Sequence, residues 1–226
     1  MKTASALRDD RGMATSLLEA VIMIAIVAVI AGMALVSAMD QLENAKLSRA
    51  NGDVQMIGIS IHSFMHDTGF APAFKAGEAR GPDDQIFFVL ETAGSNPGVV
   101  DSLHWPGDAA THERLENQLV NNRPSNSDHP YPRMGQISFS RFKGWNGPYL
   151  TRIPSSDPWD NKYLINVQLL TAKGLKMAAS TLTPGAGQRP AVFAISAGPN
   201  RQLETRFDQF ADSFVAGGDD IVFRIQ

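Results

Sequence analysis

An uncharged apolar segment from Ala20 to Met39 constrains this chain more than any other feature. Twenty helical residues rise about 30 Å, which is roughly the thickness of the hydrocarbon layer of a bilayer. A buried helix of a soluble domain is the alternative, but such a helix usually carries a polar stripe and this segment has none. The sequence therefore predicts a helix that crosses a membrane.

The residues that flank this segment predict its orientation. Lys2, Arg8 and Arg11 precede it, whereas acidic and basic residues are mixed after it. Because acidic residues contribute little to membrane orientation, these basic residues predict a cytoplasmic N-terminus and a single crossing. A secretory signal peptide is the alternative, but the apolar run is too long for one and continues into a helical pattern.

Composition narrows the classes of function. A chain of 226 residues holds one ordinary domain and an anchor. Its net charge of −3 gives no electrostatic reason to bind nucleic acid. Since there is no cysteine, disulfides, thiolate nucleophiles and Cys-ligated zinc are excluded. No catalytic triad, metal motif or phosphate loop is recognisable, so we expect a protein that is not an enzyme.

Glu19 stands directly before the uncharged segment. A carboxylate at the edge of a bilayer is costly unless it is paired or reaches the interface, so Glu19 is a candidate functional residue. The alternative is an interfacial side chain without a specific role.

The residues around Glu19 resemble a known family. The string S-L-L-E-A-V-I-M-I-A-I-V-A-V-I-A, residues 16–31, is similar to the N-terminus of type IV pilins and type II secretion pseudopilins. In that family a prepilin peptidase removes a short leader, and the fifth residue after the cut is glutamate. The resemblance implies a leader of residues 1–14 and a cut between Ala14 and Thr15. The family prefers Gly before the cut, which leaves Gly12–Met13 as the alternative bond.

The resemblance also implies how the subunit assembles. The cut exposes an α-amino group on Thr15, which the family methylates, and Glu19 of a neighbouring subunit neutralises that amine. Both charges would lie in a poorly solvated filament core, so a subunit out of register would leave them unpaired. Residues 15–39 would form the transmembrane and assembly helix, in which Gly32 allows close helix packing.

The helical pattern continues past the apolar segment. Val54, Ile57, Ile61, Phe64 and Met65 recur at spacings of three and four, which predicts an amphipathic half-helix within residues 40–72. Thr68-Gly69 and the following proline predict its end.

Two histidines on this helix are four residues apart. The spacing of His62 and His66 suits a metal ion. No partner motif accompanies them, and they fall beside the apolar stripe, so a solvated helix edge is the preferred interpretation.

The middle of the chain, residues 73–143, is variable and loop-rich in composition. We expect a short helix that starts at Asp83-Asp84 and ends near residues 93–94, a second over 111–120, and a loop over 121–132. His104, His112 and His129 are interpreted as surface histidines.

A second segment resembles the same family. G-P-Y-L-T-R-I-P-S-S-D-P-W-D-N-K-Y, residues 147–163, is similar to the G-P-Y-L…D-P-W-G-N-P-Y segment of the major pseudopilin. It predicts a turn over residues 157–161 that leads into a strand. Asp160 replaces a glycine of the family, and Lys162 replaces a proline. We expect three aromatic side chains to pack the sheet onto the helix: Trp145, Tyr149 and Trp159.

The C-terminal strands resemble the family's calcium-binding loop. Residues 191–200 and 217–225 predict two strands, each beside a loop. The resemblance implies a Ca²⁺ site, for which the oxygen atoms of Ser196, Asn200, Asp219 and Asp220 are candidate ligands. In the family Asp stands at position 200 and Gly at position 201, where this chain has Arg201. Simple solvated carboxylates are the alternative, and two further carboxylates could join a rearranged site: Asp208 and Asp212.

Together these features predict an α+β fold, the pilin fold, in which a long N-terminal α-helix packs its distal half on a small antiparallel β-sheet within residues 144–226. The resemblance implies a structural subunit of a type II secretion pseudopilus. Its partners would be copies of itself, other pseudopilins, the prepilin peptidase and the inner-membrane secretion platform, and no nucleic acid. The subunit would lie in the bacterial inner membrane with its C-terminal domain in the periplasm. Two alternatives stay open: a pilin or minor pilin of a type IV pilus, for adhesion or DNA uptake, and a membrane-tethered ligand-binding domain or enzyme.

Overall fold

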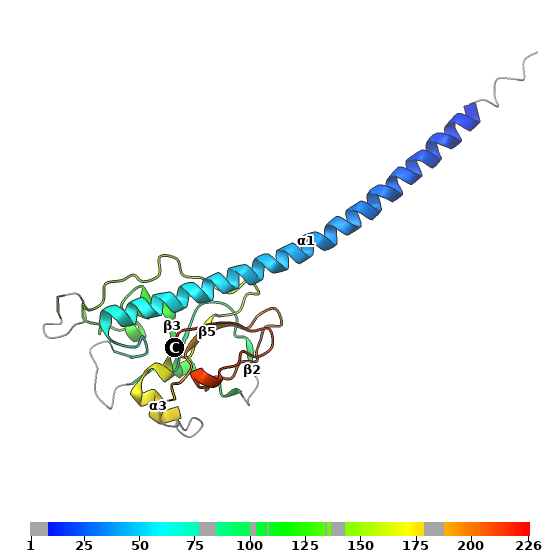
Figure 1. The fold of residues 1–226 in the computed structure, drawn as a ribbon. Helices are drawn as coiled ribbons and strands as arrows, with labels where there is room; N and C mark the ends of the chain where they lie inside the picture. Colours follow the sequence, from blue (N-terminus) through cyan, green and yellow to red (C-terminus); the bar gives the residue numbers. More distant parts are fainter. Residues whose placement is uncertain are drawn as a thin grey trace, which may run out of the picture. The chain divides into compact units, whose positions relative to one another are not determined.

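The computed structural model describes residues 9–76, 85–99, 103–107, 109–133, 135–136, 143–178 and 188–226. The chain divides into two compact units, residues 1–46 and residues 47–226. A single helix of 60 residues, α1 (Asp9–Thr68), contributes to both units (Figure 1).

In the first unit, the large apolar side chains of α1 between Leu17 and Leu42 are all exposed to solvent, by 50 to 69% of their surface. This helix is long and apolar enough to cross a membrane, with a mean hydropathy of 2.8 in its most apolar part. It is therefore compatible with the single-pass anchor that the sequence predicts. The exposed side chains between Leu17 and Met39 are Leu17, Leu18, Val21, Ile22, Met23, Ile24, Ile26, Val27, Val29, Ile30, Met33, Leu35, Val36 and Met39.

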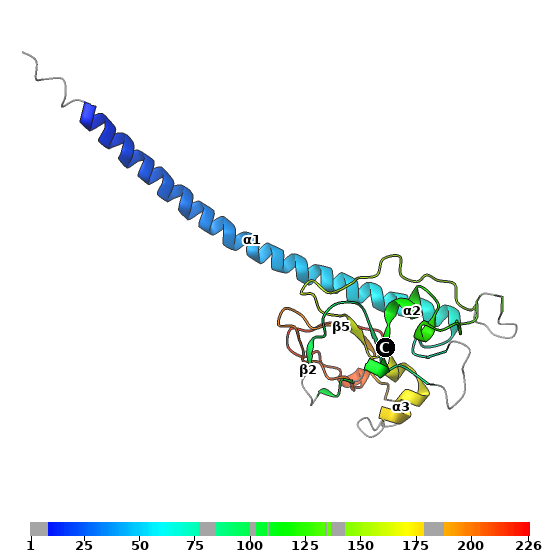
Figure 2. The ribbon, with the colours of Figure 1, turned by 180° about the vertical axis from the view of Figure 1, so that it is seen from behind.

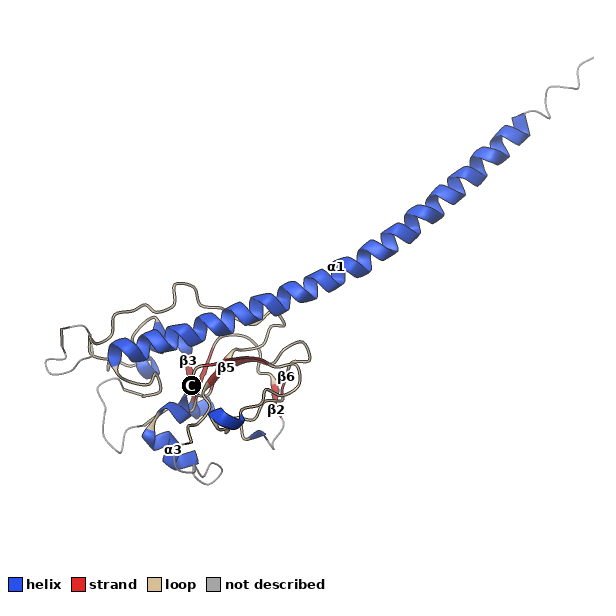
Figure 3. Ribbon diagram, in the orientation of Figure 1, coloured by secondary structure: helices blue, strands red, loops and turns tan. Residues whose placement is uncertain are grey.

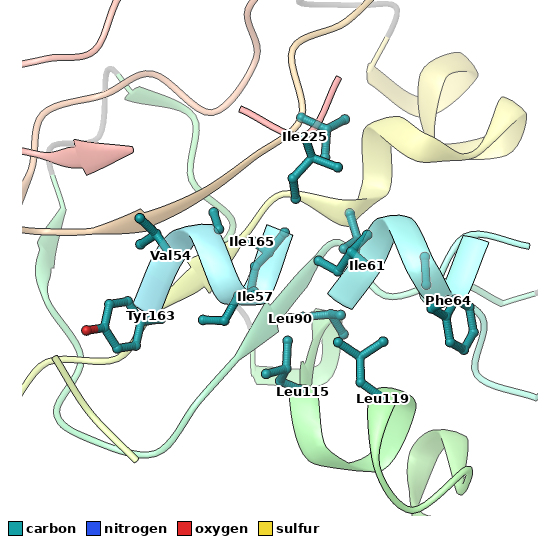
Figure 4. Close-up of a cluster of buried hydrophobic side chains, with 14 of the residues drawn as sticks. Val54, Ile57, Ile61, Phe64, Leu90, Leu115, Leu119, Tyr163, Ile165 and Ile225 are labelled. Carbon is teal, nitrogen blue, oxygen red and sulfur yellow. The ribbon is translucent and has the colours of Figure 1, made fainter. Parts of the chain in front are cut away.

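In the second unit, the remainder of α1 forms one side of the core. Four side chains of the predicted apolar stripe expose at most 1% of their surface, which confirms the stripe: Val54, Ile57, Ile61 and Phe64 (Figure 4). The helix ends where the sequence indicates: the amide of Gly69 (φ 73°) donates to the carbonyl of Met65. Burial of this stripe thus fixes α1 to the rest of the unit.

A five-stranded sheet packs against this stripe, in the spatial order β3-β1-β4-β5-β7. Figure 3 draws the strands of this sheet in red and labels two of them, β3 and β5. Three pairings are antiparallel, but β1 and β3 are parallel. The predicted α+β class is confirmed, while the prediction of an antiparallel sheet is wrong because this sheet is mixed. In chain order the strands are β1 (Val89–Glu91), β3 (His112–Arg114), β4 (Leu164–Ile165), β5 (Phe193–Ser196) and β7 (Ile221–Arg224).

The middle region supplies two of these strands, and both helices predicted there need correction. Residues 89–91 form β1 and not a helix; Asp83 and Asp84 lie outside the described residues. In the second stretch only α2 (Leu115–Leu119) is α-helical, because the residues before it form β3. Short apolar runs do not distinguish a strand from a buried helix, and pairing with β4 decides in favour of the strand here.

The remaining elements of the described residues are short. A small parallel ladder joins β2 (Gly98–Val99) to β6 (Gln202–Leu203). Figure 2 shows α2 beside the end of α1, and α3 (Ala172–Ala178) at another edge of the unit. The short 3₁₀ helices are η2 (Ala109–Thr111), η3 (Pro124–Asn126), η4 (Val167–Leu170) and η5 (Ala211–Ser213).

The predicted turn at residues 157–161 is present. The carboxylate of Asp157 accepts hydrogen bonds from the amides of Trp159 and Asn161, at 3.0 and 2.7 Å. Trp145 and Trp159 are buried in the core beside α1, and the Tyr149 ring lies 5.5 Å from that of Phe64. These contacts confirm that the three predicted aromatic residues join the C-terminal part of the chain to the helix.

Two glycines of α1 give opposite predictions for the same substitution. A Cβ at Gly58 would overlap the ring of Phe223 on β7, whereas nothing lies within 4 Å of a Cβ at Gly52. We expect Gly52→Ala to raise the free energy of unfolding by up to about 1 kcal/mol, the usual gain in helix propensity. Gly58→Ala should lower it by about 1–3 kcal/mol despite that gain, because the ring must move. Urea unfolding of both variants tests the packing of β7 on α1, and a more stable Gly58→Ala variant would contradict it.

Candidate functional site

The C-terminal acidic loop, defined here as Asn200, Glu204, Asp219 and Asp220, lies where three strands end. Asn200 lies in the turn between β5 and β6, and Glu204 directly follows β6. Asp219 and Asp220 directly precede β7. The turn at Asn200 joins the end of β5 to the start of β6, and β7 pairs with β5. The residues of the acidic loop therefore come together from three segments of the chain.

Hydrogen bonds connect the members of the acidic loop. Asp220 Oδ2 accepts from the amides of Glu204 and Thr205, at 2.9 and 2.6 Å. Asp219 Oδ2 accepts from the amide of Asn200, at 3.0 Å. Glu204 Oε2 accepts from the side-chain amide of Asn200, at 3.0 Å, and from the amide of Asp219, at 3.3 Å. Hydrogen bonds from amides thus hold three carboxylates in this loop.

The second oxygen of each aspartate is unsatisfied. Oδ1 of Asp219 and Oδ1 of Asp220 are both buried, and neither accepts a hydrogen bond from the described residues. Burial raises the pKa of Asp220, and the negative charge of Glu204 adds to the increase, although hydrogen bonds from Thr205 and the amides oppose it. Buried oxygens without a donor are rare and destabilising, and a bound cation would satisfy both.

The backbone around these carboxylates is close-packed. Gly198 (φ 64°) and Gly218 (φ 48°) adopt conformations that favour glycine. A Cβ at Gly218 would overlap the carboxylate of Glu204, and one at Gly198 would overlap the carbonyl oxygen of Asp219. Carboxylate and carbonyl oxygens therefore crowd this loop. Such a set of hard oxygen atoms suits Ca²⁺, which takes six to eight of them on a flexible loop.

No three His, Cys, Asp or Glu side chains among the described residues converge as a ready-made metal cluster. A cation here would therefore take main-chain carbonyl oxygens in addition to Asp219 and Asp220. Glu204 is exposed, and its carboxylate would turn from its present hydrogen-bond partners toward the ion.

The structure brings three of the four predicted ligands together, because Asn200, Asp219 and Asp220 belong to the acidic loop. Ser196 lies elsewhere: its buried hydroxyl donates to Asp157 Oδ2 at 2.7 Å. Ser196 thus stabilises the turn at residues 157–161, and its role as a ligand stays a prediction.

Neither of the spare carboxylates joins the acidic loop. Asp208 is buried and pairs with His104, at 2.9 Å, and with Arg206. Asp212 is exposed on η5. The sequence analysis did not identify Glu204. Its position four residues after Asn200, within the long connection of residues 202–216, could have indicated an additional carboxylate near the candidate ligands.

The predicted processing and assembly residues lie on α1. Gly12, Met13, Ala14 and Thr15 are all within the helix, so both candidate scissile bonds are helical in the uncut chain. Residues 1–8 of the predicted leader lie outside the described residues. Glu19 is exposed, one helical turn after Thr15.

The histidines differ in their surroundings. His62, His66 and His129 are exposed, and His104 is 38% exposed at its side chain. The interpretation of His112 as a surface histidine is wrong, because only 18% of its side chain is exposed and both ring nitrogens have partners.

Comparisons of the chain with protein-family models, with curated proteins and with solved structures found no match.

Proposed function

We propose that this chain is a structural subunit of a membrane-associated filament of the pseudopilin kind, and not an enzyme. The observation that carries the proposal is the apolar half of α1, residues 17–39, whose large side chains are left uncovered by the part of the chain that the structure describes. Soluble monomers rarely expose a continuous apolar surface of this extent. A bilayer before assembly, and copies of the same helix afterwards, would cover it on all sides.

A single acidic side chain at one end of this surface supports the filament over a simple anchor. Glu19 follows Thr15 by one turn, next to the uncharged segment. In a filament, the carboxylate of one subunit would neutralise the α-amino group that cleavage exposes on its neighbour. An anchor with no partner would have no use for a carboxylate at this depth.

The backbone at two positions also supports the resemblance to pseudopilins. Asp160 and Arg201 stand where that family has glycine, and their φ angles are 73° and 61°. Positive φ is uncommon for residues other than glycine. The chain thus keeps a backbone conformation suited to glycine at both positions, although the side chains differ.

In this proposal the prepilin peptidase would cut on the cytoplasmic side, and the inner-membrane platform would add subunits to a periplasmic pseudopilus for protein export. The acidic loop would bind Ca²⁺ and hold the end of β6 to the start of β7. The ion would act on stability, with no part in chemistry.

The mature N-terminus provides the direct test. When the chain is co-expressed with a prepilin peptidase in bacterial membranes, we expect intact-mass spectrometry to show loss of residues 1–14 and a chain that begins at Thr15. A cut after Gly12 would leave Met13 first and is distinguished by mass. Expression without the peptidase is the control. A chain that keeps residues 1–14 and remains a water-soluble monomer would refute the proposal.

A further inference from the structure

A cavity of about 330 Å³ lies within the second unit, remote in sequence from the apolar half of α1. Residues from β1, β3 and β4 form its floor, and residues that follow β2 and precede η2 form its walls. Its size falls at the lower end of the range for small-molecule sites. Filament assembly and the acidic loop make no use of it.

The cavity has an apolar wall that is held in place. The indole of Trp105 donates to the carbonyl oxygen of Thr205, at 2.7 Å, and its ring packs edge-on against Phe193 and Phe207. Leu164 and Leu203 continue the wall, and both are nearly fully buried. This wall suits an aromatic or aliphatic body.

The floor holds a half-buried charged network. Glu91 accepts a hydrogen bond from Lys162 Nζ at 2.8 Å and one from His112 Nδ1 at 2.9 Å. Burial by itself would raise the pKa of Glu91, but these two partners outweigh it and the pKa is lowered. The other ring nitrogen of His112 lies 2.8 Å from the carbonyl oxygen of Pro106. Both ring nitrogens of His112 are therefore engaged, which fixes the ring beside Glu91.

The network leaves cationic donors available. Lys162 gives only one of its three N–H groups to Glu91. Arg114 lines the cavity, and its guanidinium has no ion-pair or hydrogen-bond partner in the part of the chain described. Glu113 does not offset it, since its oxygens accept from the amides of Arg114 and Ser125 and from Asn117. Both carboxylates thus have partners of their own, and the cavity is left with N–H donors of Lys162 and Arg114.

We propose that this cavity binds a small organic acid, with an aromatic or aliphatic body against Trp105, Leu164 and Leu203 and its carboxylate between Arg114 and the free N–H groups of Lys162. Arginine suits a carboxylate because its planar fork can donate two parallel hydrogen bonds. Lys162 stands where the pseudopilin segment that residues 147–163 resemble has proline, so this feature is particular to the present chain.

Binding of 3-phenylpropionate by the full-length chain in a non-ionic detergent tests the proposal. Isothermal titration calorimetry measures the affinity for this acid. The control ligand is 3-phenylpropan-1-ol, which has the same hydrocarbon body but no charge. We expect the acid to bind at least about tenfold tighter than the alcohol, since hydrogen bonds to charged groups are the stronger ones. Each probe partitions into the detergent to the same extent whichever variant is present. Differences in affinity between variants therefore measure binding in the cavity.

Three variants locate the site. Arg114→Gln should weaken binding of the acid about tenfold while it leaves the alcohol unchanged. Arg152→Gln, which alters another exposed arginine outside the cavity, should change neither. Gly107→Trp places a large ring where nothing lies within 4 Å of a Cβ, and it should remove binding of both probes. Equal affinity for acid and alcohol, no binding of either, or equal losses in the two arginine variants would overturn the proposal.

Discussion

Glu19→Ala should leave the chain in the membrane and reduce its assembly into filaments by at least about a hundredfold. The helix loses no apolar surface, so insertion is retained. Assembly fails because the α-amino group of the neighbouring Thr15 is then buried without a counter-charge, a defect that typically costs several kcal/mol at each contact. Membrane fractionation and electron microscopy of sheared filaments measure the two outcomes separately.

Two further substitutions separate charge from volume at this position. Glu19→Gln keeps the shape of the side chain and removes its charge, so it should fail as Glu19→Ala does. Leu18→Ala trims a neighbouring side chain, 63% exposed in the single chain, and should assemble with at most a modest loss. Normal filaments from Glu19→Gln would show that the charge of this side chain is not what joins the subunits.

The long helix was predictable because its signals are local and agree. The uncharged segment, the stripe from Val54 to Phe64 and the stop at Thr68-Gly69 each depend on residues within a few turns. The turn at Asp157 was equally local, since one side chain satisfies the amides two and four residues ahead. These parts of the fold needed no knowledge of distant contacts.

The sheet was harder to predict because its pairings are not local. β1 pairs with β3, 23 residues along the chain, and with β4, more than 70 residues along. Neither strand is longer than three residues, so no alternating pattern marks them. His112 was misjudged for the same reason: it is β3 that brings this histidine beside Glu91.

The candidate metal site was predicted in part. The resemblance to the family's calcium-binding loop is what pointed to Asn200, Asp219 and Asp220. Glu204 was missed, since its contacts with the turn at Gly218 join residues 15 and 16 positions apart along the chain. The hydrogen bond of Ser196 to Asp157, 39 residues away along the chain, could not be predicted from the residues around Ser196.

Calcium should raise the thermal stability of this protein substantially. At a free concentration one hundred times the dissociation constant, a single site adds about 2.7 kcal/mol. For a domain of this size that gain corresponds to roughly 5–10 °C in Tm. Calorimetry of the full-length chain in detergent, with excess EGTA and then with millimolar Ca²⁺, measures the change. The physical reason is that the ion would satisfy the buried Oδ1 atoms of Asp219 and Asp220.

The effect of Asp220→Asn on stability should have opposite signs in EGTA and in Ca²⁺. Without metal, the raised pKa of Asp220 means that its favourable contribution is present below the ordinary value of 3.8 and is lost as the pH rises and the carboxyl ionises. At neutral pH and in EGTA, the neutral amide should therefore be at least as stable as the wild type. In Ca²⁺ the wild type gains stability and the variant does not, because the ion needs the ionised carboxylate. Asp212→Asn, which removes an exposed carboxylate of η5, should keep the full response to Ca²⁺. If the wild-type Tm is the same in EGTA and in Ca²⁺, the acidic loop holds no calcium, and its two unsatisfied oxygens need another explanation.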